Sequence, residues 1–380
     1  MNPWTRTTAA AALLLALVPA CPRLRAADEA PPEPGVETGQ IQGARFGIAV
    51  PPGSWNHRLL LLVHGYRPDS APLIPDLHPD REPNRTLLGE GWIVATTSFR
   101  RNGLIVGDAI ADVDALRAYI ANAYGEPERV ILSGESLGGL IVTIMAERDK
   151  GSYDGAIAYD PALYSKEPNS RLGLSLLPRI PLLFVATHLE ITPPRSYLTA
   201  LTSRPEPTVQ PALFLINRDG HTNVNQAEHL EAIRAMNDWI DGGPGALPRP
   251  KPPSPYFDAT IEPQPGPSTA ILHPDAKGFD SRIAGIDAVY GNILLEAQAA
   301  DFAAAGIAPM TFFELGAGGH TYRVLYGRSY TDVKIGEWIA FPDADGHTLL
   351  SRYLADGAAT AGVKTGNTVS LVRYAAPAGH

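Results

Sequence analysis

A serine stands at the centre of the hexapeptide GESLGG, residues 134–139. The β-prone run RVILS (129–133) precedes it, and an apolar run with the character of a buried helix follows it. This order predicts a strand, a sharp turn with Ser136 at its apex, and then a helix. Gly134 and Gly138 fall where strand and helix would approach too closely for a side chain. The stretch therefore indicates a nucleophilic serine.

A serine hydroxyl is a poor nucleophile unless a base removes its proton and a carboxylate holds that base. His221 is the predicted base, because it follows the apolar run 211–217 and precedes the helical pattern 225–240. The acid has two candidates. Glu190 lies just beyond the strand-like run 180–187, and Asp160 lies beyond the run 153–159. Both alternatives stay open.

Acyl transfer also needs two N–H donors for the oxyanion that forms on the substrate. The residue after the nucleophile, Leu137, is predicted to supply one, and the backbone of Tyr66 in the His-Gly-Tyr sequence 64–66 the other. Gly65 and His188 are expected to line the substrate site. His64 is expected to pack and hydrogen-bond locally. His229 lies within a helical pattern and is expected at the surface.

These residues must be positioned by an alternation of apolar strands and amphipathic helices. Such an alternation predicts a parallel α/β sheet, and ligands bind at the carboxyl ends of its strands. The candidate side chains follow strand-like runs, which fits that rule. The expected strands are 58–64, 92–97, 130–133, 153–159, 180–187 and 211–217, after an early strand at 41–51, and the expected helices include 108–124 and 225–240.

Residues 41–241 resemble an α/β-hydrolase of the serine-esterase kind, through His-Gly-Tyr, Gly-Glu-Ser-Leu-Gly-Gly, the Pro-Pro loop after Glu190, and Gly-His. The stretch SFRRNG (98–103) is similar to feruloyl-esterase, tannase and polyester-depolymerase groups. The resemblance implies cleavage of a small-molecule or polymeric carboxylic ester through an acyl-enzyme, with no metal or organic cofactor. A peptidase or amidase with the same triad is the alternative.

The Pro- and Gly-rich stretch 242–268 is predicted to be a linker, either a spacer or a strap laid on a surface. Residues 269–380 change character. Short strand-like runs separated by turns predict a small C-terminal all-β, barrel-like domain. The expected strands there are 270–272, 285–297, 311–315, 320–325, 333–341 and 368–374, and DADG (343–346) is expected to be a turn.

An ordered series of short segments in this domain resembles the C-terminal β domain of the SAM hydroxide adenosyltransferases: DAVYGNI (287–293), YTDV (330–333), DGAA (356–359) and GNTVS (366–370). The resemblance implies a nucleoside ligand near Asp287 or Asn292 and contacts between subunits of a homo-oligomer. An accessory domain beside the active site is the simpler reading. A ligand-binding protein with a vestigial hydrolase fold is a further alternative.

The N-terminus predicts export, to the periplasm or the medium. Residues 1–26 have a weakly positive start and an apolar run at 9–20 that is too short to span a bilayer, as in a signal peptide. Residues 27–40 are expected to be a flexible leader. The alternative ending is a lipid anchor on Cys21, since VPAC (18–21) resembles a lipobox. Cys21 is the sole cysteine, which excludes an intrachain disulfide.

Net charge sets one further limit. The chain carries a formal charge of −9 and has no long Lys/Arg block, so nucleic acid is not an expected partner.

Overall fold

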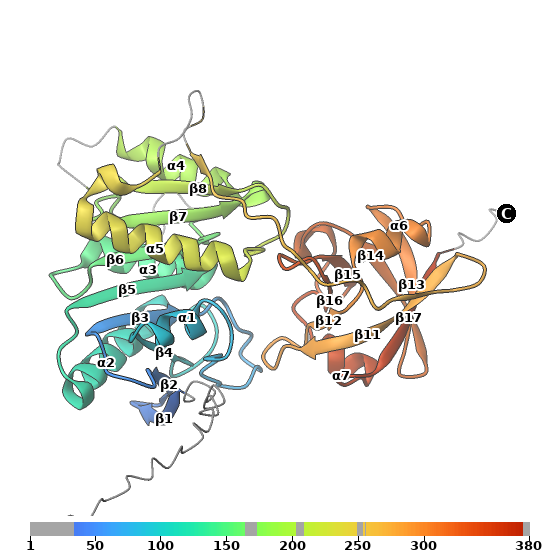
Figure 1. Cartoon of the computed structure of the whole chain (residues 1–380), viewed down its shortest axis with the longest axis horizontal. Coiled ribbons are helices and arrows are strands. Elements are labelled where there is room, and N and C mark those ends of the chain that lie inside the picture. Colours follow the sequence, from blue (N-terminus) through green and yellow to red (C-terminus); the bar gives the residue numbers. More distant parts are fainter. Residues whose placement is uncertain (1–33, 164–172, 203–208, 249–253, 255, 375–380) are drawn as a thin grey trace, which may run out of the picture. The chain divides into compact units, whose positions relative to one another are not determined.

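A mostly parallel sheet of nine strands carries the residues predicted to do chemistry (Figure 1). The computed structural model describes residues 34–163, 173–202, 209–248, 254 and 256–374. The strand order is β1-β2-β4-β3-β5-β6-β7-β8-β9, with β2 antiparallel to β1 and β4, and the later neighbours parallel. The strands are β1 (Gly35–Ile41), β2 (Ala44–Val50), β3 (Arg58–Val63), β4 (Ile93–Thr97), β5 (Arg129–Glu135), β6 (Gly155–Tyr159), β7 (Leu182–Thr187), β8 (Ala212–Ile216) and β9 (Phe257–Asp258).

Helices cover both faces of this sheet and bury its apolar residues. One core contains residues of α2, α3 and α4, and the other contains residues of α1 and α5. Along β3, Leu59 and Leu61 enter the first core and Leu60 enters the second. Burial on both faces explains why the strand is a continuous apolar run. The helices are α1 (Asn84–Gly89), α2 (Val106–Tyr124), α3 (Leu137–Arg148), α4 (Thr192–Leu201) and α5 (Gln226–Gly242).

The strand order, the antiparallel β2 and a sharp turn between β5 and α3 define an α/β-hydrolase fold. The predicted fold class is confirmed, and the expected strands from 58 to 217 lie within a few residues of β3 to β8. Helix α4 was not predicted. It begins at Thr192, where the Pro-Pro pair was read as a loop. Proline is well suited to the first turn of a helix because the N–H it lacks has no partner there.

The predicted flexible leader is wrong over its last residues, because Gly35–Ile41 form β1. This strand pairs with β2 in a hairpin. The Glu37 carboxylate also accepts hydrogen bonds from the hydroxyls of Tyr119 and Tyr124 on α2. Cross-strand and side-chain bonds of this kind order a segment whose composition alone predicts flexibility.

The stretch predicted as a linker contributes to the hydrolase sheet. Strand β9 pairs in parallel with β8. Just beyond β9, the Ile261 N–H donates to Glu228 of α5 at 2.9 Å, and the Asn225 side chain donates to the Ile261 carbonyl at 2.7 Å. This part of the stretch is therefore a strap bound to the sheet edge and to α5.

The C-terminal part of the chain is a closed β barrel. Its ring runs β11-β12-β16-β15-β14-β13-β17, and β17 pairs back onto β11, with β10 added beside β11. Phe302 of α6 lies in its core against Phe279, Phe313 and Tyr326. The elements are β10 (Ile271–Leu272), β11 (Gly278–Ile286), β12 (Ile293–Leu295), α6 (Ala299–Ala304), β13 (Thr311–Ala317), β14 (His320–Tyr326), β15 (Trp338–Pro342), β16 (Thr348–Arg352), α7 (Gly357–Ala361) and β17 (Thr368–Arg373).

The barrel-like domain is confirmed, but two expected strands have the wrong bounds. The expected strand 333–341 begins only at Trp338, the first residue of β15. Residues 285–297 were predicted as continuous, whereas a turn separates β11 from β12. The Asp287 carboxylate accepts from the N–H groups of Val289 and Tyr290, and Gly291 has a φ of +66°. Side-chain capping of the backbone therefore turns the chain here. DADG (343–346) is a turn, as expected.

The described residues from Pro34 onward, which include both the nine-stranded sheet and the barrel, belong to a single compact unit. The predicted signal peptide, the first half of the predicted leader and Cys21 lie outside the described residues. Within the described ranges, no helix has the length and apolar character needed to cross a membrane.

Candidate active site

Ser136 occupies the sharp turn between β5 and α3. Its φ of 53° and ψ of −114° are unusual for a residue with a side chain and mark backbone strain. The turn is tight because strand and helix nearly touch. A Cβ atom on Gly138 would lie 2.0 Å from the Val63 carbonyl oxygen, and one on Gly134 would lie 2.4 Å from that of Gly138. The two glycines are therefore required by close approach, as the sequence predicted.

His221 lies beside the serine. Its Nε2 atom is 2.8 Å from Ser136 Oγ, which is the distance required for proton transfer from a hydroxyl to an imidazole. The histidine comes from the loop between β8 and α5. In that loop Gly220 has a φ of +112°, a conformation that favours glycine. The candidate nucleophile and base, separated by 85 positions, meet at the carboxyl edge of the sheet.

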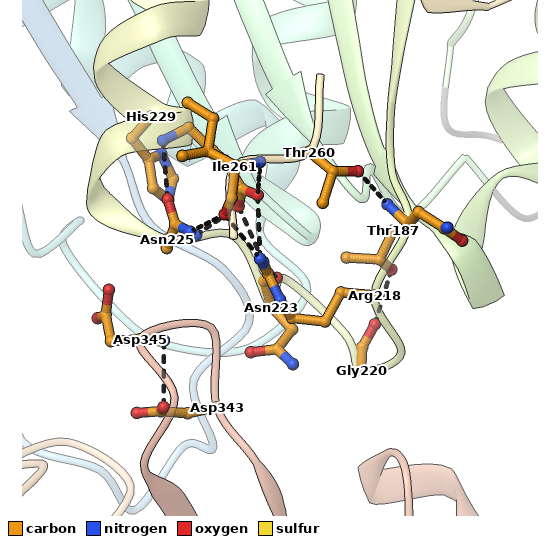
Figure 2. A network of polar contacts seen from close by, with 12 residues as sticks. Thr187, Arg218, Gly220, Asn223, Asn225, His229, Thr260, Ile261, Asp343 and Asp345 are labelled. Atoms are coloured by element: carbon orange, nitrogen blue, oxygen red, sulfur yellow. Dashed lines mark hydrogen bonds and ion pairs between the residues drawn. The ribbon is translucent and has the colours of Figure 1, made fainter. Parts of the chain in front are cut away.

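A hydrogen-bond network holds the loop that carries His221 (Figure 2). Thr187 at the end of β7 donates to the Gly220 carbonyl at 2.7 Å, and the Asn223 side chain donates to the Asp219 carbonyl at 2.7 Å. Arg218 donates to the Asn223 carbonyl at 3.0 Å. At the start of α5, Asn225 and Glu228 form a capping box. Fixed anchors on both sides of His221 restrict where its ring can lie.

Glu190 lies beside Nδ1 of His221, the ring nitrogen that does not contact Ser136. It ends a short 3-10 helix, His188–Glu190, directly after β7, and its Oε1 lies 3.4 Å from His221 Nδ1. Burial lowers the pKa of His221. The hydrogen bond with Glu190 and the charges of nearby carboxylates outweigh burial and hold this pKa above its ordinary value. The arrangement favours the tautomer in which Nε2 is free to take a proton.

Asp160, the other candidate acid, is engaged elsewhere. Its carboxylate accepts from the N–H and hydroxyl of Thr187 at 2.7 and 2.8 Å, and from the Thr222 N–H at 2.7 Å. Burial raises its pKa to about 6. The hydrogen bonds from Thr187 and Thr222 oppose this effect by stabilising the ionised form. Asp160 ties the end of β7 to the loop of the candidate base and acts on His221 through its charge.

The predicted oxyanion donors lie on both sides of the serine. Leu137 is the first residue of α3, so its N–H is among those that lack an intrahelical acceptor. On the other side, a Cβ on Gly65 would lie 3.3 Å from Ser136 Cβ. His64 Nδ1 lies 2.7 Å from the Gly65 carbonyl oxygen, which belongs to the same peptide unit as the Tyr66 N–H. In a trans peptide the N–H points away from the carbonyl, so His64 fixes the direction of the Tyr66 N–H.

The imidazole of His64 is neutral at neutral pH. Burial lowers the pKa of His64 to about 4. A neutral ring that contacts a carbonyl through Nδ1 carries its proton there and donates it. The expectation that His64 packs and hydrogen-bonds locally agrees with this contact.

Ser136 and His221 open into a cavity of about 600 Å³, a size typical of small-molecule sites. Gly65 and Tyr66 line it as well. Asp287 and Asn292, which one resemblance associates with a nucleoside, also line this cavity; that ligand stays a prediction. His188 is not among the lining residues. Its side chain is 62% exposed, and its Nδ1 lies 3.4 Å from Asp219 Oδ1.

Two ionisable residues near Ser136 were not singled out as part of the site. Glu135 precedes the nucleophile and lines the cavity, and its side chain is 49% exposed. His229 Nε2 lies 3.7 Å from Glu135 Oε1. His229 was expected at the surface, but its side chain is only 14% exposed and its ring packs on Tyr159. Its contacts with Tyr159 of β6 and Glu135 of β5 place it on the side of α5 that faces the sheet.

Within the described ranges, no group of three or more His, Cys, Asp or Glu side chains is arranged to hold a metal ion.

Neither family models nor curated proteins match this chain. Among solved structures, a putative dipeptidyl aminopeptidase IV from Bacteroides ovatus matches at 14% identity and a TM-score of 0.44, over 55% of this chain and 36% of that one. The chain thus spans about a third of that protein's length.

Two shorter proteins match over most of their own length. A putative dienelactone hydrolase from Klebsiella pneumoniae matches at 13% identity and a TM-score of 0.41, over 55% of this chain and 98% of that one. An esterase from Pyrococcus furiosus matches at 14% identity and a TM-score of 0.41, over 55% and 91%. All three TM-scores are below 0.5, so the class of fold is assigned from this chain's own strand order and nucleophile turn.

Proposed function

We propose that this protein is a serine hydrolase that cleaves carboxylic esters through an acyl-enzyme intermediate. The observation that carries the proposal is the 2.8 Å contact between His221 Nε2 and Ser136 Oγ at the mouth of a cavity. A serine in a strained turn, with an imidazole at this distance and a carboxylate behind the imidazole, is the arrangement used for nucleophilic acyl transfer.

In the proposed reaction, Ser136 Oγ attacks the ester carbonyl carbon while His221 Nε2 takes the hydroxyl proton. The N–H groups of Leu137 and Tyr66 bind the oxyanion, and His221 then gives its proton to the leaving alcohol. Water, activated by the same imidazole, attacks the acyl-enzyme to release the acid and restore Ser136. Glu190 stabilises the imidazolium that forms in both steps.

Fluorophosphonate labelling followed by intact-mass measurement tests this proposal. The wild-type protein is expected to gain one adduct and to hydrolyse p-nitrophenyl acetate. Ser136→Ala is expected to gain no adduct and to lose at least about 10⁴-fold in kcat, since the nucleophile itself is removed. Ser133→Ala, a change of the same type on β5, is the matched control and is expected to label. A wild-type protein that stays unlabelled would overturn the proposal.

The choice of ester over amide needs a second measurement. Paired p-nitrophenyl esters and p-nitroanilides with the same acyl group separate the esterase and amidase activities. An amine leaving group depends more strongly than an alcohol on a proton from the His221 imidazolium. Turnover of the esters only is expected. Comparable kcat/KM values for the anilides would favour the peptidase or amidase alternative.

A further inference from the structure

The cavity above Ser136 is lined by residues from two distant parts of the chain. The His-Gly-Tyr loop, the nucleophile turn and the loop of the candidate base supply part of it. Turns of the β barrel supply the rest. The barrel residues used below are Tyr290 and Ala355. Both lie in the same compact unit as the α/β-hydrolase sheet.

One of these barrel residues touches the loop that is proposed to hold the oxyanion. The Tyr290 hydroxyl donates a hydrogen bond of 2.7 Å to the carbonyl oxygen of Tyr66, 224 positions earlier in the chain. Burial raises the pKa of Tyr290 to about 12, so the hydroxyl keeps its proton and remains a donor at neutral pH. The contact is therefore maintained wherever the hydrolase is expected to work.

This contact restrains the peptide unit next to the one that donates to the oxyanion. His64 fixes the Gly65 carbonyl, and hence the direction of the Tyr66 N–H, from one side. Tyr290 fixes the following carbonyl, that of Tyr66, from the other. With its own peptide plane and the following one both held, the Tyr66 N–H has little freedom to turn away from Ser136. Oxyanion donors are effective because they are oriented before the reaction begins.

A second contact joins the barrel to the loop of the candidate base. The Asn223 side chain donates to the carbonyl of Pro342, at the end of β15, at 3.1 Å. The same side chain holds the Asp219 carbonyl, just before His221. The barrel therefore contacts both loops that flank Ser136.

We infer that the β barrel completes the substrate pocket of the proposed esterase and that Tyr290 is a positioning residue for the oxyanion loop. The inference rests on the proposed function. It assigns a role to the C-terminal part of the chain: the barrel forms one wall for the substrate and also orders the Tyr66 peptide.

The test of Tyr290 removes only its hydroxyl. In the full-length protein, Tyr290→Phe is expected to lower kcat for p-nitrophenyl acetate about tenfold with little change in KM, because an oxyanion donor is loosened and not deleted. A trifluoromethyl ketone, which forms an oxyanion on Ser136, is expected to bind about tenfold more weakly. The rate of fluorophosphonate labelling is expected to fall in parallel.

Tyr322→Phe is the matched control. It removes a barrel hydroxyl that also donates to a backbone carbonyl, that of Thr360 at 3.0 Å, but Tyr322 does not line the cavity. Its kcat and ketone affinity are expected to equal those of the wild type. Equal kcat and ketone affinity in both variants would overturn the role of Tyr290. The midpoint of thermal unfolding is measured for both, so that assays are run on folded protein.

The role of the barrel as one wall of the substrate cavity is tested by a separate substitution outside the oxyanion loop. Ala355→Trp adds bulk to the cavity from the barrel side and is expected to raise KM at least fivefold for a long-chain p-nitrophenyl ester, and to raise KM for p-nitrophenyl acetate by a smaller factor. Unchanged kinetics with both esters would show that the barrel does not contact the substrate. Wild-type labelling at Ser136 is a separate readout, so failure of either barrel test leaves the proposed hydrolase intact.

Discussion

At the scale of single residues, the two candidate acids differ in the groups that they contact. Glu190 faces His221 Nδ1 at 3.4 Å, whereas the Asp160 oxygens are taken by Thr187 and Thr222. Both charges raise the pKa of His221. The difference in hydrogen bonding predicts different consequences when each carboxylate is neutralised.

Glu190→Gln is expected to lower kcat by about 10² to 10⁴, because the tautomer of the base is no longer held. The base must be neutral to accept a proton, so activity rises as pH passes upward through the pKa of His221. Glu190 holds that pKa above its ordinary value. Its removal is therefore expected to shift the acidic limb of the kcat/KM profile to lower pH, with stability nearly unchanged.

Asp160→Asn serves as the comparison. It replaces an acceptor of bonds from Thr187 and Thr222 with a group that also carries donors, and is expected to lower the free energy of unfolding by about 1.5–3 kcal/mol. Urea unfolding measures this change. A large loss of kcat in Asp160→Asn with unchanged stability, and a near-normal Glu190→Gln, would assign the acid to Asp160 instead.

At the scale of elements, the nucleophile turn depends on close approach between α3 and β3. The Val63 carbonyl occupies the space where a side chain on residue 138 would lie. Backbone atoms cannot move aside as a flexible side chain can, so the turn requires a residue without Cβ. The residue pattern of the turn thus reflects packing as well as chemistry.

Gly138→Ala is expected to destabilise the protein by about 3 kcal/mol or more, because a contact of 2.0 Å must be relieved by backbone displacement. Gly107→Ala on α2 is the control, since a Cβ there meets nothing within 4 Å. It is expected to be neutral or to stabilise by up to about 1 kcal/mol. Thermal and urea unfolding compare the two, and equal stabilities would contradict the role of close packing at the turn.

At the scale of the whole molecule, the chain combines an α/β-hydrolase sheet, a strap along the sheet edge and a closed barrel. We propose that this molecule works after export, because residues 1–26 have the pattern of a signal peptide. Its negative net charge and the absence of a paired cysteine do not oppose an extracytoplasmic location.

Export predicts a specific mass. When the full chain is expressed in a Gram-negative host, the periplasmic protein is expected to lack about 26 residues, as measured by intact-mass spectrometry. The alternative, lipidation, would give a membrane-associated form that begins at Cys21 and carries lipid. Cys21→Ala would convert that form to a soluble one and would leave signal-peptidase processing unaffected. Full-length protein confined to the cytoplasm would contradict export in both forms.

The sequence by itself determined the hydrolase fold. Strands buried on both faces are continuous apolar runs, and the glycines of the nucleophile turn are required by local contacts. Both features can therefore be recognised from short segments of the sequence. It also placed Ser136, His221 and Glu190 at strand ends that share one edge of the sheet. It did not reveal β1, and it left the strap as one of two alternatives for the linker, because the order of both comes from pairing with distant partners.

Tertiary structure alone decided which carboxylate faces His221, because both candidates follow parallel strands and only the hydrogen bonds of Asp160 distinguish them. It also decided that His188 points away from the cavity. The contact of Tyr290 with Tyr66 joins residues 224 positions apart. Tyr290 lies in the turn between β11 and β12, where the sequence predicted one continuous strand. Side-chain patterns report which face of an element is buried, but which distant segment covers that face depends on how the whole chain packs.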